Sequence, residues 1–230
     1  YTIYPVLDSP IDCPADPIVY KVIVNPTPSI SFIEDKILCN EQLTSIIFIS
    51  GTSGGNETYN WISDIEIGAG FSGTGDMNFT ANNLTTEPIV ATITVTPTFE
   101  NEGIVCDGED KTFTITVNPT VVVNTLPDQY ITSGQTSSSV NISSNTTNVT
   151  FNWTAVADSG ITGLINSSST GTTFIPAETL FNSGTAPLDV TYTIYPVLDS
   201  PIDCPADPIV YKVIVNPTPS ISFIEDKILC

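Results

Sequence analysis

The side chains of this chain with the greatest capacity for chemistry are its cysteines, because the sequence contains no histidine. Five cysteines are present, but Cys13 and Cys230 are copies, one sequence repeat away, of Cys204 and Cys39. One period therefore holds three cysteines, Cys39, Cys106 and Cys204, so at least one is left without a partner in its own period. The chemistry they offer is disulfide formation, since isolated cysteines without histidine make a poor set of zinc ligands.

Carboxylates form the second candidate group, because acidic residues gather in the loops before the last expected strand of each repeat unit. Calcium binds where about six to eight oxygens converge. Neither loop has the spacing of an EF-hand or of a calcium-binding nonapeptide repeat, so solvated surface charge is the favoured interpretation, calcium is the alternative, and no other cofactor is expected. The residues are Asp8, Asp12 and Asp16 in one loop and Glu100, Glu102, Asp107, Glu109 and Asp110 in the other.

Catalysis is disfavoured by the side chains that are missing. Without histidine the usual acyl-transfer and general-base arrangements are not available, and no GxSxG, Gly-rich phosphate loop or HExxH motif is present. A carboxylate pair can cleave glycosides, but acidic turns in a repeated protein are typically solubilising. We therefore expect no enzyme activity and assign no catalytic residue.

The charge balance excludes two classes of partner. The formal net charge of −20 arises from 25 acidic residues against 5 basic ones. Phosphate recognition needs clustered Lys and Arg, so no nucleic-acid partner is expected. No run approaches the roughly 18 apolar residues of a membrane-spanning helix, so membrane insertion is not predicted either.

The chain is built from repeats at two levels. Residues 1–39 recur without change as residues 192–230, a shift of 191 positions, which indicates recent duplication within a longer array. The motif VNPT begins at Val24, Val117 and Val215 and marks units of about a hundred residues, the size of an immunoglobulin-like sandwich. We expect the C-terminal part of a truncated repeat at 1–26, a type 1 repeat at 27–119, a type 2 repeat at 120–217 and the start of another at 218–230.

Apolar residues alternate with polar ones throughout each unit, which is the period-two pattern of half-buried strands. In KTFTITVNP, for example, Phe113, Ile115 and Val117 fall on one face. Strands are expected at 44–50, 57–63, 88–99, 111–119, 148–156 and 188–198, and no helix. Trp61 and Trp153 occupy the third strand of their units, where a sandwich buries a large aromatic in its core. The predicted fold class is all-β: tandem immunoglobulin-like, antiparallel β-sandwiches arranged end to end as a rod.

The junctions between units are proline-locked. Pro26, Pro119 and Pro217 follow the last strand directly, and proline restricts both itself and its predecessor, so neighbouring units should be held semi-rigidly. Cys39 ends a first strand and Cys106 a sixth, which places them at opposite poles of one sandwich, about 30 Å apart, beyond the limit near 7 Å for a disulfide.

When units stack, however, Cys39 of one faces Cys204 of the next, and we expect an interdomain disulfide there. Cys106 would meet Ser133 of the alternate unit and stay unpaired. The alternative is that all these thiols are reduced and buried.

The sequence contains the motifs LCNEQLTSIIF, YNWISDIEIGAGFSGTGDMNFTA and VATITVTPTFENEGIVCDGEDKTFTITVNPT. Together with their counterparts, these motifs resemble the PKD-like repeats of giant Bacteroidota cell-surface adhesins, including those of gliding motility. The resemblance spans the chain and implies export by type IX secretion to the exterior of the outer membrane of a Gram-negative bacterium. It implies as partners the neighbouring repeats, a surface polysaccharide or substratum, and, through other parts of the chain, the secretion and gliding machinery.

The function expected is an adhesive fibre segment, in which the strong negative charge keeps neighbouring fibres apart. One alternative is a carbohydrate-binding module, which would need an exposed aromatic platform; Tyr59, Phe71 and Tyr130 are its candidates. The other is a passive stalk that spaces a different exported domain.

Overall fold

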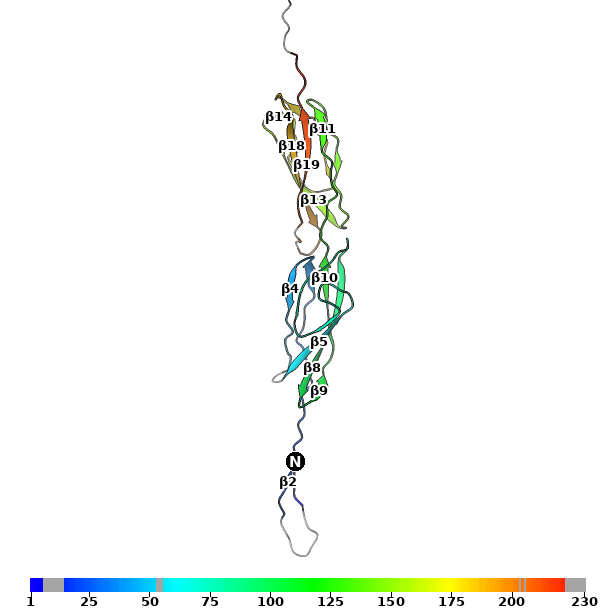
Figure 1. The fold of residues 1–230 in the computed structure, drawn as a ribbon, viewed down its shortest axis with the longest axis vertical. Coiled ribbons are helices and arrows are strands. Elements are labelled where there is room, and N and C mark those ends of the chain that lie inside the picture. Colours follow the sequence, from blue (N-terminus) through cyan, green and yellow to red (C-terminus); the bar gives the residue numbers. More distant parts are fainter. Residues whose placement is uncertain (6–14, 53–55, 203, 205, 222–230) are drawn as a thin grey trace, which may run out of the picture.

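The chain is all-β. The computed structural model describes residues 1–5, 15–52, 56–202, 204 and 206–221, and every regular element in this part is a strand. The described residues accordingly contain no helix that could cross a membrane. Two sandwich units lie one beyond the other along the long axis (Figure 1). We call them unit 1, from Ile30 to Asn118, and unit 2, from Val123 to Asn216.

Unit 1 consists of one large sheet faced by a two-stranded sheet. The large sheet has the order β3-β10-β8-β5-β6, with β9 paired to β8, and the small sheet pairs β4 with β7. The strands are β3 (Lys36–Cys39), β4 (Leu43–Ile46), β5 (Glu57–Ser63), β6 (Ser72–Thr74), β7 (Met77–Thr80), β8 (Ile89–Asn101), β9 (Ile104–Asp107) and β10 (Lys111–Asn118).

Unit 2 repeats this plan. Its large sheet has the order β11-β19-β18-β13-β15, and two small sheets pair β12 with β16 and β14 with β17. The strands are β11 (Gln129–Thr132), β12 (Val140–Asn141), β13 (Val149–Ala157), β14 (Ile161–Thr162), β15 (Ser168–Thr172), β16 (Phe174–Ile175), β17 (Phe181–Asn182), β18 (Leu188–Leu198) and β19 (Ile209–Asn216).

One pair of strands in each large sheet is parallel, while all its other pairs are antiparallel. In unit 1, β3 runs parallel to β10, with Cys39 opposite Asn118; in unit 2, β11 runs parallel to β19, with Thr132 opposite Asn216. The expected antiparallel sandwich therefore carries one parallel edge per unit. Because first and last strands run toward the same pole, Cys39 and the end of unit 1 lie together where unit 2 begins.

The alternating sequence pattern decides which faces are buried. Phe113, Ile115 and Val117 of β10 are 3%, 0% and 0% exposed. Strands β5 and β18 coincide with the expected 57–63 and 188–198. The strand expected at 44–50 is shorter, because after Ile46 the amide of Phe48 donates to Asp76 Oδ1 at 2.9 Å instead of to a neighbouring strand.

Each unit has its own apolar core. The unit 1 core surrounds Trp61, and the unit 2 core surrounds Trp153; the two clusters share no residue. In unit 2 the rings of Trp153, Tyr192 and Tyr211 form a chain of contacts with centroid separations of 5.6 Å. Separate cores mean that the link between the units depends on the few contacts at their junction.

The first residues form a hairpin with the register of unit 2. Strand β1 (Thr2–Ile3) pairs with β2 (Ile18–Val19), Thr2 opposite Val19. In unit 2 the identical residues Thr193 and Val210 are opposite one another. The two pairs of this hairpin, Thr2 with Val19 and Ile3 with Ile18, thus have the register of the last hairpin of unit 2. Cys13, Asp8 and Asp12, and the expected repeat start from 222 onward with Cys230, lie outside the described residues.

Candidate functional site

The junction between the units contains a disulfide. Cys39, at the end of β3, is bonded to Cys204, in the connection between β18 and β19, with an S–S distance of 2.09 Å and a Cα–Cα distance of 5.5 Å. Both residues are 9% exposed. Cys39 reaches this place because the parallel pairing carries β3 to the same pole as the end of β10.

Apolar side chains surround the bond. Cys39, Cys204, Val121 and Leu198 form a small buried cluster that is separate from both cores, with Val149, Ile202 and Ala206 packed against it. Val121 follows the linker proline Pro119, which is itself buried. The cluster excludes water from the bond and fills the space between the two poles.

Polar residues of the VNPT motif bridge the two units. Asn118 is 3% exposed, and its Nδ2 donates to Ser200 Oγ at 2.6 Å and lies 3.6 Å from Cys204 Sγ. Thr120 Oγ1 accepts from Asn40 Nδ2 at 2.8 Å. At this junction the asparagine and the threonine of the motif thus make side-chain contacts, in addition to the restriction that proline imposes.

A further contact closes another part of the junction. Thr147 Oγ1 of unit 2 donates to Glu87 Oε2 of unit 1 at 2.6 Å, and the Thr147 amide lies 3.4 Å from the Thr86 carbonyl oxygen. Hydrogen bonds to a charged acceptor are the stronger class. Together with the disulfide, these bonds fix the rotation of one unit against the other.

A groove of about 890 Å³ runs beside the disulfide. Its lining combines aliphatic side chains, such as Ile37, Ile202 and Ile209, with the polar Gln42 and Asp207. Two carboxylates, Glu41 and Asp207, are among its described lining residues, and no aromatic side chain is. This largely aliphatic composition suits packing between the units.

The tryptophans and junction prolines occupy different environments. Trp61 and Trp153 are buried in their cores, at 6% and 2% exposure. Pro119 is buried at the junction, Pro217 is half-buried and Pro26 is exposed. The buried proline is thus the one that lies between the two described units.

The candidate aromatic platform does not come together. Tyr59 is 9% exposed and packs on Phe48 in the unit 1 core. Phe71 and Tyr130 are exposed, but Phe71 belongs to unit 1 and Tyr130 to β11 of unit 2. The three therefore share no common face, because one of them is a core residue.

Cys106 lies away from the junction. It is on β9, opposite Phe99 of β8, and among the described cysteines it is the one outside a disulfide. The sequence placed it at the end of a sixth strand, but β9 is a separate strand after a tight turn with Glu102 and Gly103 at φ 50° and 80°. The counterpart of Cys39 in unit 2 is Thr132 and not the expected Ser133, because Thr132 faces Asn216 as Cys39 faces Asn118.

The acidic loops form no metal site in the part of the chain that is described: no three Asp, Glu or Cys side chains gather there as ligands. Asp110 Oδ1 accepts from Thr96 Oγ1 at 2.6 Å, and Glu109 pairs with Lys111 at 3.1 Å. These carboxylates are engaged with neighbouring strands or face solvent.

Two buried asparagines were missed by the sequence analysis. Asn83 Nδ2 donates to the carbonyl oxygens of Glu87 and Val117, and Asn182 Nδ2 donates to those of Ala186 and Val215. Each one ties a loop to the end of the last strand, so that the pole facing the next unit is held in shape. The two asparagines lie 34 and 33 positions before the valine of VNPT, so an alignment on that motif with a one-residue gap would have shown the shared asparagine.

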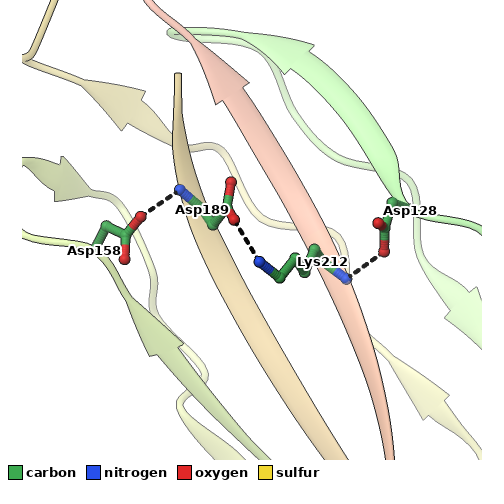
Figure 2. A network of polar contacts seen from close by, with 4 residues as sticks. All are labelled: Asp128, Asp158, Asp189 and Lys212. Carbon is green, nitrogen blue, oxygen red and sulfur yellow. Dashed lines mark hydrogen bonds and ion pairs between the residues drawn. The ribbon is translucent and has the colours of Figure 1, made fainter. Parts of the chain in front are cut away.

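The outer face of unit 2 carries a polar network (Figure 2). Lys212 Nζ donates to Asp189 Oδ2 at 2.8 Å, the Asp189 amide donates to Asp158 Oδ2, and the Lys212 amide donates to Asp128 Oδ1. The hydrogen bond to Asp189, followed by its charge, raises the pKa of Lys212 above its usual value. The network links β18 and β19 with the segments that precede β11 and follow β13.

Several solved structures are similar to the chain at low identity. They include a Bacteroides ovatus mixed-linkage glucan utilization locus protein, SGBP-B (14% identity, 84% of this chain and 48% of that one, TM-score 0.29), and mouse cadherin-23 EC22-24 (9%, 84% and 64%, 0.36). The N-terminal four Ig domains of Dscam1 match as well (8%, 89% and 50%, 0.38). The chain spans from about half to just under two thirds of these structures' lengths.

Among curated proteins, no sequence matches this chain. One family model does match, over residues 129–219, and its description is PKD-like domain. Those residues run from the start of β11 to just past the end of β19, so the match covers the whole large sheet of unit 2. Residues 129–219 of the chain thus match a PKD-like domain, and they fold as the β-sandwich of unit 2.

Proposed function

We propose that this chain is a repeat segment of a giant secreted cell-surface adhesin filament, one that provides reach and surface adhesion in gliding motility, as in adhesins of the SprB type. The observation that carries the proposal is the identity of residues 1–39 with residues 192–230. Exact repetition of the last part of a unit 2-type repeat is what duplication of whole units produces. Added units lengthen a fibre.

The junction supports a fibre rather than two loosely tethered domains. The units are joined by a disulfide, by an apolar cluster and by hydrogen bonds on more than one side. A formal charge of −20 adds mutual repulsion between neighbouring chains. Both features favour long, separate, semi-rigid filaments.

The proposed location is the extracellular surface, outside the outer membrane of a Gram-negative bacterium, reached by type IX secretion. The proposed partners are neighbouring repeats and a surface polysaccharide or substratum. Coupling to the gliding machinery would come through other parts of the chain.

The test is to label this repeat with fluorescent antibody fragments on live, intact cells of the source organism and to follow the labels. We expect labels that travel along the cell surface. Stationary labels would favour the passive stalk, and labelling only after permeabilisation would refute the exported-adhesin proposal. An antibody against a periplasmic protein of the same cells is the control for intactness.

A glycan array distinguishes the carbohydrate-binding alternative from the filament. It is probed with the native chain and with the variants Phe71→Ala and Tyr130→Ala. These are the exposed members of the aromatic candidates. Binding that either substitution abolishes would favour that alternative over the filament.

A further inference from the structure

The position of the disulfide in the covalent chain has a mechanical consequence. We propose that the Cys39–Cys204 bond is a tension bypass: a pull applied to the two ends travels along residues up to 39, through the bond, and on from residue 204. Residues 40–203 then lie in a closed loop that carries no tension. This rests on and deepens the filament function proposed above, because a filament that grips a surface is under load. The bypass itself follows from the covalent connectivity of the chain.

The bypassed loop holds nearly all of both sandwiches. Cys39 is the last residue of β3, and Cys204 lies just before β19. Everything from β4 to β18, including both tryptophans, is therefore inside the loop. Only the first strand of unit 1 and the last strand of unit 2 remain on the loaded path, together with the segments that flank them.

The length that the bond conceals is large. The sequence separation of the two cysteines is 165, which at 3.3–3.6 Å per residue corresponds to roughly 550–590 Å of extended chain. The bond replaces this length with a Cα–Cα span of 5.5 Å. Unfolding of either sandwich would therefore add almost none of this length to a stretched, oxidised chain.

The repeat period suggests what this does for an array. One period is a shift of 191 positions. One such bond per period bypasses the 165 positions between the two cysteines. The remaining 26 positions (191 − 165) stay extensible, about 90 Å when fully drawn out. Two stacked sandwiches with strands like β8 and β18, of 13 and 11 residues, measure about 80 Å at 3.4 Å per residue. The covalent path is thus nearly as short as the folded rod.

The loaded strands are anchored and the bond is protected. Strand β3 pairs in register with β10 over four residues, and β19 lies between β18 and β11. Both half-cystines are 9% exposed inside the apolar junction cluster, which limits access of a thiolate to the bond, and exchange depends on that access. The adhesive faces would stay folded while the filament pulls.

The test is single-molecule force spectroscopy on the full 230-residue chain, held at its termini by cysteine-independent handles, with and without reductant. Non-reducing peptide mapping of the same preparation establishes whether Cys39 and Cys204 are joined. We expect the oxidised chain to show no large unfolding steps, and the reduced chain to gain about 550–590 Å of contour length in total. The Cys39→Ser/Cys204→Ser variant should behave as the reduced chain does in both conditions.

Cys106→Ser is the matched control, because it removes a thiol and leaves the bypass intact; it should give the native oxidised trace. The proposal is overturned if the oxidised native chain releases the full length of both units, or if mapping finds these two cysteines unjoined. Moving labels on cells together with full-length release would reject the bypass and keep the filament. If the oxidised chain shows no large unfolding steps and the cells show no surface labelling, the bypass is kept and the filament is rejected.

Discussion

Unit 1 and unit 2 solve the same folding problem with different side chains. Both place a parallel first strand beside the last, a tryptophan on the third strand, and a buried asparagine against the last strand. What differs is the chemistry around these shared positions. The comparison separates what the sandwich requires from what each unit adds.

The tryptophans show the first difference. Trp153 Nε1 donates to the carbonyl oxygen of Phe174 at 3.2 Å, whereas the buried Trp61 Nε1 has no partner among the described residues. In unit 1, Gly73 lies so close to the indole that a Cβ there would clash with Trp61 Cζ2. The Trp61 ring is thus held by close packing, whereas the Trp153 ring is held by packing and a hydrogen bond.

The second difference concerns the core beside the tryptophans. Val95 faces Trp61 and Ile194 faces Trp153, so Ile93 and Phe113 of unit 1 correspond to Tyr192 and Tyr211 of unit 2. Burial raises the pKa of Tyr192 to about 12 and raises that of Tyr211 as well. Unit 2 therefore has ionisable groups where unit 1 has hydrocarbon.

The largest expected effect tests whether the cores are independent. Trp61→Ala should cost about 3–5 kcal/mol of unfolding free energy in unit 1 alone, and Trp153→Ala a similar amount in unit 2 alone, because each leaves a large cavity. Hydrogen exchange resolved by residue would assign the loss to one unit. Equal loss of protection in both units from one substitution would show that they unfold together.

The next effect comes from alkali. In the folded state a buried tyrosine with a raised pKa stays protonated, whereas in the unfolded state it ionises above about pH 10. Its contribution to the free energy of unfolding is therefore present below about pH 10 and is lost as the pH rises toward 12. Unit 2 should lose roughly 2 kcal/mol through Tyr192 over this window. Tyr59, whose pKa burial raises by less, gives unit 1 a smaller loss.

Tyr192→Phe is the control for that titration, since it keeps the ring and removes the ionisable hydroxyl. Urea unfolding at pH 8, 10 and 11.5 would measure the slope in both proteins. If the variant keeps the native slope, the pH dependence arises from another group.

Replacing each tryptophan by phenylalanine sharpens the comparison. Trp153→Phe removes one of two donors to the Phe174 carbonyl oxygen, which also accepts from Thr172 Oγ1 at 3.2 Å, whereas Trp61→Phe removes a donor that the described residues do not pair. We expect Trp153→Phe to be the more destabilising by about 1 kcal/mol, the usual net worth of a hydrogen bond. Chemical denaturation of both variants would measure the difference; equal losses would mean that the bond to Phe174 contributes nothing.

The smallest effect belongs to the surface. Lys212 corresponds to Thr114 of unit 1, since each donates its amide to an aspartate, Asp128 or Asp35. Lys212→Met removes the half-exposed ion pair with Asp189 but keeps this amide bond, and ion pairs at the surface contribute little. The melting temperature should change least of all these variants, and 1 M salt should abolish the change. A salt-independent loss would instead point to packing of the lysine stem.

The sequence was sufficient for the five long strands β5, β8, β10, β13 and β18 and for the buried faces of the cores. Alternation placed Phe113, Ile115 and Val117 inside, and the size of Trp61 and Trp153 placed them in the cores, because burial of apolar surface dominates each choice. It was insufficient for the short strand β4 and for the separate strand β9. These depend on a side-chain acceptor, Asp76, and on a tight turn, which no periodicity reports.

Among the site residues, the sequence alone identified the cysteines, the prolines and the recurring VNPT motif, since residue type and spacing are one-dimensional properties. The tertiary structure decided that β3 runs parallel to β10, which asparagines are buried and that Tyr59 is a core residue. Those outcomes depend on contacts between residues far apart in the chain, such as Lys36 of β3 and Ile115 of β10, which are register partners. Local pattern carries no information about which distant segments will become neighbours, because that choice is made by the packing of whole sheets.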